Sequence, residues 1–112
     1  MLFRSLAART REDLEREAAR IRADFGVEAL VHARDLSKLA EVEALGADCG
    51  NVDILVNNAG DIPTGTLTEL DAAAWRRGWD LKVFGFIDLT RIIYYAMVER
   101  RAGVIEIGRA HV

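Results

Sequence analysis

The sequence has only one cysteine, one proline and two histidines among its 112 residues. Cys49 has no partner for an internal disulfide, which favours a reducing compartment, so we expect a cytoplasmic protein. His32 and His111 lie far apart in the sequence without metal-ligand spacing, and we expect no metal site. No apolar run approaches the roughly 20 residues that a membrane-spanning helix requires, so we expect no membrane partner.

The sequence also lacks an excess of positive charge. Its formal net charge is -3, and no basic stripe alternates with aromatic residues. This pattern argues against nucleic acid as a partner, because nucleic-acid binding depends on clustered basic side chains. The hydrophobic content of 51% is enough for a core, and the length allows one domain at most.

Helical and strand-like segments alternate along the chain. Apolar spacing predicts helices over residues 10–25, 38–45 and 71–100, and strands over residues 27–33, 52–56 and from residue 104 onward. We expect Gly26, Gly46 and Gly103 to end the three helices, and the long helix to bend near Gly78 or Gly85. Strands separated by helices favour a parallel sheet that is covered on both faces, so the predicted fold class is α/β.

The most specific segment is an apolar strand that ends in a turn of small residues. The strand ends at Val56, and the turn consists of Asn57, Asn58, Ala59 and Gly60. Asn supplies local donors and acceptors, and Gly allows free backbone angles, so a flat ligand can approach the backbone here. This segment resembles the Asn-Asn-Ala-Gly signature of the classical short-chain dehydrogenases/reductases.

The resemblance covers residues 6 to about 105 and implies one partial, NAD(P)-binding domain over residues 1–112, with an incomplete Rossmann-type doubly wound parallel sheet. It implies that residues 57–60 steady the central sheet and line the cofactor ribose. The full-length parent would reduce a carbonyl or oxidise an alcohol of a small-molecule substrate. It could form a homo-oligomer through the long helix, as is common in the family.

Two further cofactor contacts are implied at strand ends. Arg9 follows the apolar stub of residues 6–8, where the family often places an Arg for the 2′-phosphate of NADP, and this favours NADP over NAD. Asp35 matches an Asp that accepts a hydrogen bond from the adenine amino group, and the backbone amide of Leu36 would contact the ring. Alternatively, Arg9 is a solvated side chain before a helix and Asp35 is a helix cap.

The long helix departs from the family at Lys82. The resemblance places a catalytic Asn at this position, where it anchors a water in a proton relay. A Lys brings three donors, no acceptor and a charge. Lys82 could still donate to a relay water, could mark altered or lost chemistry, or could be a helix side chain that faces solvent.

Several functional parts of the family are missing from the sequence. No Gly-x-Gly turn precedes the first helix to hold a pyrophosphate. No catalytic Ser is found, and Tyr94 and Tyr95 are followed four residues later by Val98 and Glu99 instead of a Lys. We expect both Tyr side chains to pack in a core or under a lid. The alternative to an oxidoreductase piece is therefore a non-catalytic truncated product, or a nucleotide-binding module without activity.

Both ends indicate truncation. Residues 106–112 leave the family pattern abruptly and, back-translated, resemble a sequencing-library adapter, and residues 1–5 resemble the opposite adapter. We therefore expect the natural insert to be residues 6–105; a rival interpretation of the start is a transit peptide, since residues 1–11 are Arg-rich and lack acids. Truncation would leave the strand at residues 27–33 without its neighbour, and would make the chain marginally stable or prone to aggregate.

Overall fold

The computed structural model describes residues 3–60 and 62–108, which fall into two compact units divided after Asp35. Each unit combines helices with one pair of parallel strands. The predicted α/β class is confirmed.

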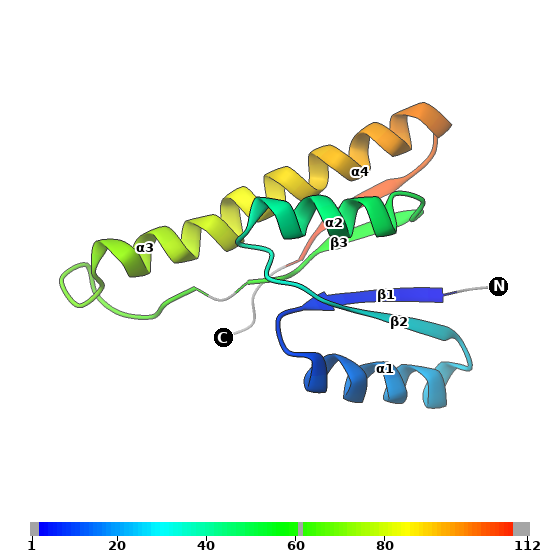
Figure 1. Ribbon diagram of the computed structural model, residues 1–112, viewed down its shortest axis with the longest axis horizontal. Coiled ribbons are helices and arrows are strands. Elements are labelled where there is room, and N and C mark those ends of the chain that lie inside the picture. Colours follow the sequence, from blue (N-terminus) through cyan, green and yellow to red (C-terminus); the bar gives the residue numbers. More distant parts are fainter. Residues whose placement is uncertain (1–2, 61, 109–112) are drawn as a thin grey trace. The chain divides into compact units, whose positions relative to one another are not determined.

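The first unit is a strand–helix–strand element. Strand β1 (Phe3–Ala8) pairs in parallel with β2 (Glu28–Ala33), from Phe3 opposite Glu28 to Ala8 opposite Ala33. Helix α1 (Arg11–Phe25) connects them and lies along the pair (Figure 1). Its buried side chains are Leu14 and Ala18, and Ala29 on β2 is buried too.

The predicted end of the first helix is confirmed at Gly26. This residue has φ of 62°, and its N–H donates to the Arg22 carbonyl at 3.0 Å. Gly adopts this left-handed conformation without the steric penalty that a Cβ would bring, so the chain can turn directly into β2.

The expectation that the strand at residues 27–33 lacks a neighbour is wrong. β1 begins at Phe3, before the apolar stub of residues 6–8, and it pairs with β2 over its whole length. Strand pairing depends on backbone groups, so residues 3–5 extend the ladder whatever the origin of their side chains. The boundaries of the natural insert remain a prediction, and residues 1–2 and 109–112 of the two expected tails lie outside the described residues.

The second unit contains the remaining elements. They are α2 (Leu39–Cys49), β3 (Ile54–Asn57), α3 (Ala72–Trp79), the π-helical segment η1 (Asp80–Gly85), α4 (Phe86–Arg100) and β4 (Val104–Ile107). β3 and β4 pair in parallel, from Ile54 opposite Val104 to Asn57 opposite Ile107. α2 packs beside α4 (Figure 1), and their buried side chains form most of the core: Val42, Leu45, Cys49, Leu89, Ile93 and Met97.

The prediction that Gly46 ends the second helix is wrong, because α2 continues to Cys49. A Cβ built on Gly46 would lie 2.5 Å from Cγ2 of Ile92, so this glycine is the point where α2 approaches α4. A helix tolerates an interior glycine when close packing against another element offsets its lower helix propensity. Gly46 therefore allows two helices to pack closely, and its position in the sequence does not reveal this contact.

The long predicted helix is present, with a wide turn in its middle. α3, η1 and α4 follow one another from Ala72 to Arg100, and the π-helical turn ends at Gly85, one of the two predicted bends. A Cβ on Gly85 would lie 2.5 Å from the carbonyl oxygen of Leu36, so only a glycine fits there. Arg101, with φ of 57°, ends α4 in a left-handed conformation two residues before the predicted Gly103.

Of the two expectations for Tyr94 and Tyr95, packing in a core is wrong, while packing under a lid stays a prediction. Their side chains are 54% and 64% exposed, and the two rings contact at a centroid distance of 6.3 Å. α4 turns Leu89, Ile93 and Met97 inward at four-residue spacing, which leaves the two Tyr on its outer side. Among the described residues, no helix is long and apolar enough to cross a membrane.

Candidate functional site

Asn57 is the last residue of β3, and it is 4% exposed. Its Nδ2 donates to Oγ1 of Thr90 on α4 at 2.8 Å, and its carbonyl accepts from the N–H of Gly108 at 2.7 Å. Buried amides need such partners, because an unsatisfied polar group is costly in a core. Asn57 therefore ties the end of the strand to α4, and its side chain is engaged within the protein.

The rest of the turn is open. Asn58 and Gly60 are exposed and Ala59 is half-buried, just beyond the carboxyl end of β3. Ligands of parallel α/β sheets bind at this edge, beyond the carboxyl ends of the strands. Residues 58–60 therefore have the position and the small side chains of a ligand-binding turn.

The structure brings Lys82 of η1 to this turn. A Cβ added to Gly60 would lie 3.1 Å from Nζ and 3.1 Å from Cδ of Lys82, so the lysine stem passes directly over the glycine. Any side chain at residue 60 would have to displace it. The two sequence features meet in space although they are 22 positions apart in the chain, and the π-helical turn carries the lysine.

The Lys82 ammonium is buried and makes no hydrogen bond within the described residues. Nζ lies 4.7 Å from the centroid of the Phe86 ring, which provides a cation–π contact. Such a contact stabilises the ammonium by about 0.5–2 kcal/mol. Removing an ammonium from water costs several kcal/mol unless a charged or polar partner compensates for the lost hydration. Lys82 therefore offers three donors that nothing in the described chain uses.

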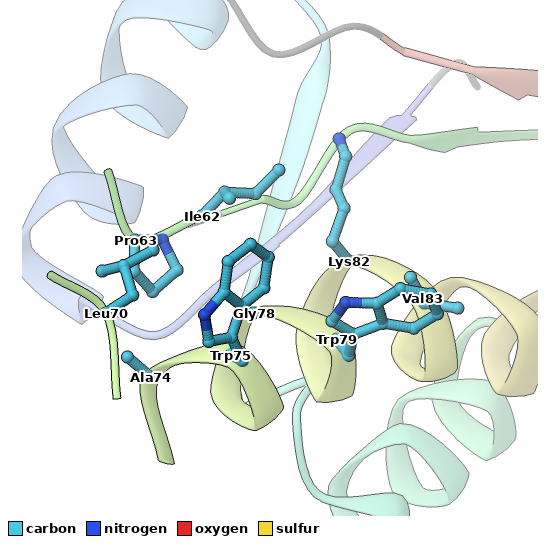
Figure 2. Close-up of a pocket in the computed structure, with 9 residues that line it drawn as sticks. All are labelled: Ile62, Pro63, Leu70, Ala74, Trp75, Gly78, Trp79, Lys82 and Val83. Carbon is cyan, nitrogen blue, oxygen red and sulfur yellow. The ribbon is translucent and has the colours of Figure 1, made fainter. Parts of the chain in front are cut away.

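The stem of Lys82 also forms one wall of a cavity of about 110 Å³. The other lining residues are apolar or lack a side chain: Ile62, Pro63, Leu70, Ala74, Trp75, Gly78, Trp79 and Val83. In Figure 2 the lysine side chain extends away from its helix and from the two indole rings, with its nitrogen at the far end. The described lining of the cavity is thus apolar apart from the Lys82 side chain.

Leu36 lies in the same unit as residues 57–60. Its side chain is buried at 7% exposure, and its carbonyl lies against Gly85 at the end of η1. The backbone at Leu36 therefore helps to fix the helical turn that carries Lys82.

Arg9 and Asp35 lie in the first unit, at one edge of its strand pair. Arg9 directly follows β1, and Asp35 follows β2 by two residues. The N–H of Arg34 donates to the Ala8 carbonyl at 2.8 Å, which holds the two strand ends together. Arg9 is exposed, and Arg34 and Asp35 are half-buried, so both cationic and carboxylate residues lie at this edge.

Sequence analysis missed Thr90 and Phe86, the side chains that contact Asn57 and Lys82. A signal was present: residues 82, 86 and 90 are spaced by four, which places side chains on one face of a helix. It was missed because an aromatic and a hydroxyl residue at helical spacing are ordinary core residues. The described residues contain no group of three or more side chains able to hold a metal.

Comparison with known proteins identifies relatives of this chain. Residues 3–107 match the model of the short chain dehydrogenase family. Nodulation protein G of Rhizobium sp. (strain N33) is 36% identical over 87 residues, which cover 74% of this chain and 36% of that protein.

Solved structures show the same fold. L-Sorbose reductase from Gluconobacter frateurii, in complex with NADPH and L-sorbose, has 32% identity and a TM-score of 0.83, over 92% of this chain and 41% of that one. A short-chain dehydrogenase from Sphingobium yanoikuyae in complex with NADPH has 26% identity and a TM-score of 0.86, over 94% of this chain and 42% of that one.

The chain thus spans between a third and a half of the length of these relatives. The Asn-Asn-Ala-Gly resemblance and the partial Rossmann-type fold predicted from the sequence are confirmed, because the family match extends over nearly all of the described residues. This chain belongs to the short-chain dehydrogenase family.

Proposed function

We propose that this chain is the dinucleotide-binding part of an NAD(P)-dependent oxidoreductase that interconverts a carbonyl compound and an alcohol. The observation that carries the proposal is the open turn of residues 58–60 beyond β3, which Asn57 anchors to Thr90 and which Lys82 adjoins. When bound, the nicotinamide supplies a hydride. The residues of this chain would hold and orient the cofactor, and Lys82 would place hydrogen-bond donors near its site.

The first unit would hold the adenosine end of the cofactor. Arg9 provides a planar pair of donors that matches the 2′-phosphate of NADP, and Asp35 provides an acceptor for the adenine amino group. Both follow parallel strands whose ends are hydrogen-bonded together, which is the edge where α/β sheets bind nucleotides. The position of Arg9 at a strand end supports NADP as the cofactor, because a guanidinium there can bind a phosphate.

The second unit would hold the ribose and nicotinamide end. Asn58, Ala59 and Gly60 supply backbone groups for the ribose without bulky side chains. Lys82 takes the position of the family's catalytic Asn, and its free donors suit an oxygen acceptor, either a relay water or a group on the substrate.

A binding function without catalysis is the second candidate. The observation that favours it is the absence of a Tyr-x-x-x-Lys pair from this sequence, since Val98 and Glu99 occupy the positions four residues after Tyr94 and Tyr95. Reduction of a carbonyl needs a proton as well as a hydride, and that pair supplies it in the family.

Titration of the purified chain with NADPH, read by calorimetry, tests the proposal. We expect saturable binding that Asp35→Asn weakens, since the amide would lose the full charge of the acceptor. Addition of a carbonyl substrate then separates the two candidates: consumption of NADPH supports an oxidoreductase, and binding without consumption supports a binding module. Absence of saturable NADPH binding would contradict both.

A further inference from the structure

The side chain of Lys82 lines an apolar cavity, and its ammonium has no hydrogen-bond partner in the described chain; this combination defines a ligand. We infer that Lys82 binds the carboxylate of a substrate whose apolar tail fills the cavity lined by Trp75 and Trp79. The inference deepens the proposed function, on which it rests, by naming the substrate class: a small keto or hydroxy acid with a branched or aromatic tail.

The first step of the argument is charge. Lys82 Nζ is buried, has no hydrogen-bond partner in the described chain, and lies 4.7 Å from the centroid of the Phe86 ring. A buried ammonium is stable when an anion with oxygen acceptors compensates it. A carboxylate provides that charge and accepts several hydrogen bonds at once.

The second step is shape. The cavity of about 110 Å³ is several times larger than the roughly 10–15 Å³ that one water molecule occupies on the same measure. Among the described residues that line it, Lys82 is the only charged one, and the indoles of Trp75 and Trp79 stand along the same side of the helix (Figure 2). Such a space favours a ligand with one anionic end and an apolar body over a sugar or another polar molecule.

The third step is location. Gly60 lies against the lysine stem, so the ammonium reaches the carboxyl end of β3, where the cofactor turn begins. A carboxylate held there would place the atoms next to it, such as a neighbouring carbonyl, close to the turn of residues 58–60. The cavity and the cofactor turn are thus joined through one side chain.

The sequence makes the test specific, because the chain has two lysines, Lys38 and Lys82. Protein labelled with carbon-13 at the lysine ε carbon would give one NMR signal for each, and the exposed Lys38 is the internal control. The probes are α-ketoisocaproate and methyl isobutyl ketone, which share the apolar tail and the carbonyl but differ in the carboxylate. No cofactor is needed, so the result is independent of NADPH binding, which is titrated separately on the same sample.

We expect α-ketoisocaproate to shift the Lys82 signal saturably and to leave the Lys38 signal unchanged. The neutral ketone should need at least a tenfold higher concentration to produce an effect. In Lys82→Met, which keeps the length of the stem, calorimetry should show at least tenfold weaker binding of the keto acid, and Lys82→Arg should retain most of it.

Three results would overturn the inference. Equal binding of the two probes would make the cavity a purely apolar site. Parallel movement of both lysine signals would indicate unspecific ion binding. An unchanged Lys82 signal would leave its donors to a relay water. If NADPH binds in these cases, the proposed function stands while the carboxylate site does not.

Discussion

The Nδ2 of Asn57 donates to Oγ1 of Thr90 at 2.8 Å, and this bond joins the end of β3 to the first half of α4. It makes the first Asn of the turn a structural residue, while the residues that follow it remain open to a ligand. The same helix carries Phe86, whose ring lies under the Lys82 ammonium. One face of α4 therefore carries both Thr90, which binds the first residue of the turn, and Phe86, which contacts the Lys82 ammonium.

Removal of either partner of this bond should destabilise the chain. We expect Thr90→Val to lower the free energy of unfolding by about 1–3 kcal/mol, because it leaves the buried Asn57 amide without its acceptor. Asn57→Ala should cost a similar amount. In urea denaturation, the double variant should cost less than the sum of the two single variants, and full additivity would show that the bond contributes nothing.

Gly46→Ala should destabilise the packing of α2 against α4. The new methyl would lie 2.5 Å from Cγ2 of Ile92, and overpacking of this kind costs about 1–3 kcal/mol. Helix propensity alone predicts the opposite sign, since Ala is the better helix former. Thermal unfolding decides between them, and the second substitution Ile92→Ala should restore part of the loss by making room for the methyl.

Arg9→Ala should reduce the preference for NADPH over NADH. Loss of charge-assisted hydrogen bonds to a phosphate weakens binding by about tenfold to a hundredfold, and NADH, which lacks the 2′-phosphate, should be much less affected. Arg11→Ala is the matched control, because Arg11 is also exposed at the start of α1 and pairs with Glu15 at 3.6 Å. Equal losses for both cofactors would contradict the role given to Arg9.

Glu69 should titrate below its ordinary range. Its Oε2 accepts from the backbone N–H of Thr66 at 2.8 Å, and hydrogen bonds from the backbone and side chain of Thr66 lower the pKa of Glu69. A lowered pKa means that the ionised form stabilises the fold; this contribution is present above the ordinary pKa of the carboxyl and is lost as the pH falls through the lowered value. NMR titration should show the pKa of Glu69 rising in Thr66→Ala, and an unchanged pKa would contradict the hydroxyl contact.

One face of the β3–β4 pair should make the chain prone to aggregate. Ile54 and Val56 are 60% and 52% exposed, and Val104, opposite Ile54, is 56% exposed. Exposed apolar strands can associate with other chains. We expect Ile54→Thr with Val56→Thr to increase the monomeric fraction in light scattering, since Thr keeps the β-branched shape and adds a hydroxyl. Cooperative unfolding of the unaltered chain as a monomer would contradict this expectation.

Much of the fold follows from local pattern. Hydrophobic periodicity and the residues that end each element predict three of them. These are the helix that ends at Gly26, the apolar strand before Asn57 and the long helix that ends near Arg100. The prediction for Gly46 is wrong because a glycine that ends a helix and a glycine at a helix–helix contact give the same pattern in the sequence. Tyr94 and Tyr95 were placed in a core because aromatic residues favour one, but α4 faces the core with another side.

By itself, the sequence determined the α/β class and the family, because hydrophobic periodicity and the Asn-Asn-Ala-Gly turn are properties of neighbouring residues. Only the tertiary structure decided what the turn adjoins. It tied Asn57 to Thr90, placed Lys82 over Gly60 and left the lysine donors without a partner in the described chain. These contacts join residues 22 and 33 positions apart, and they depend on how a wide helical turn packs against a strand end, which no local pattern encodes.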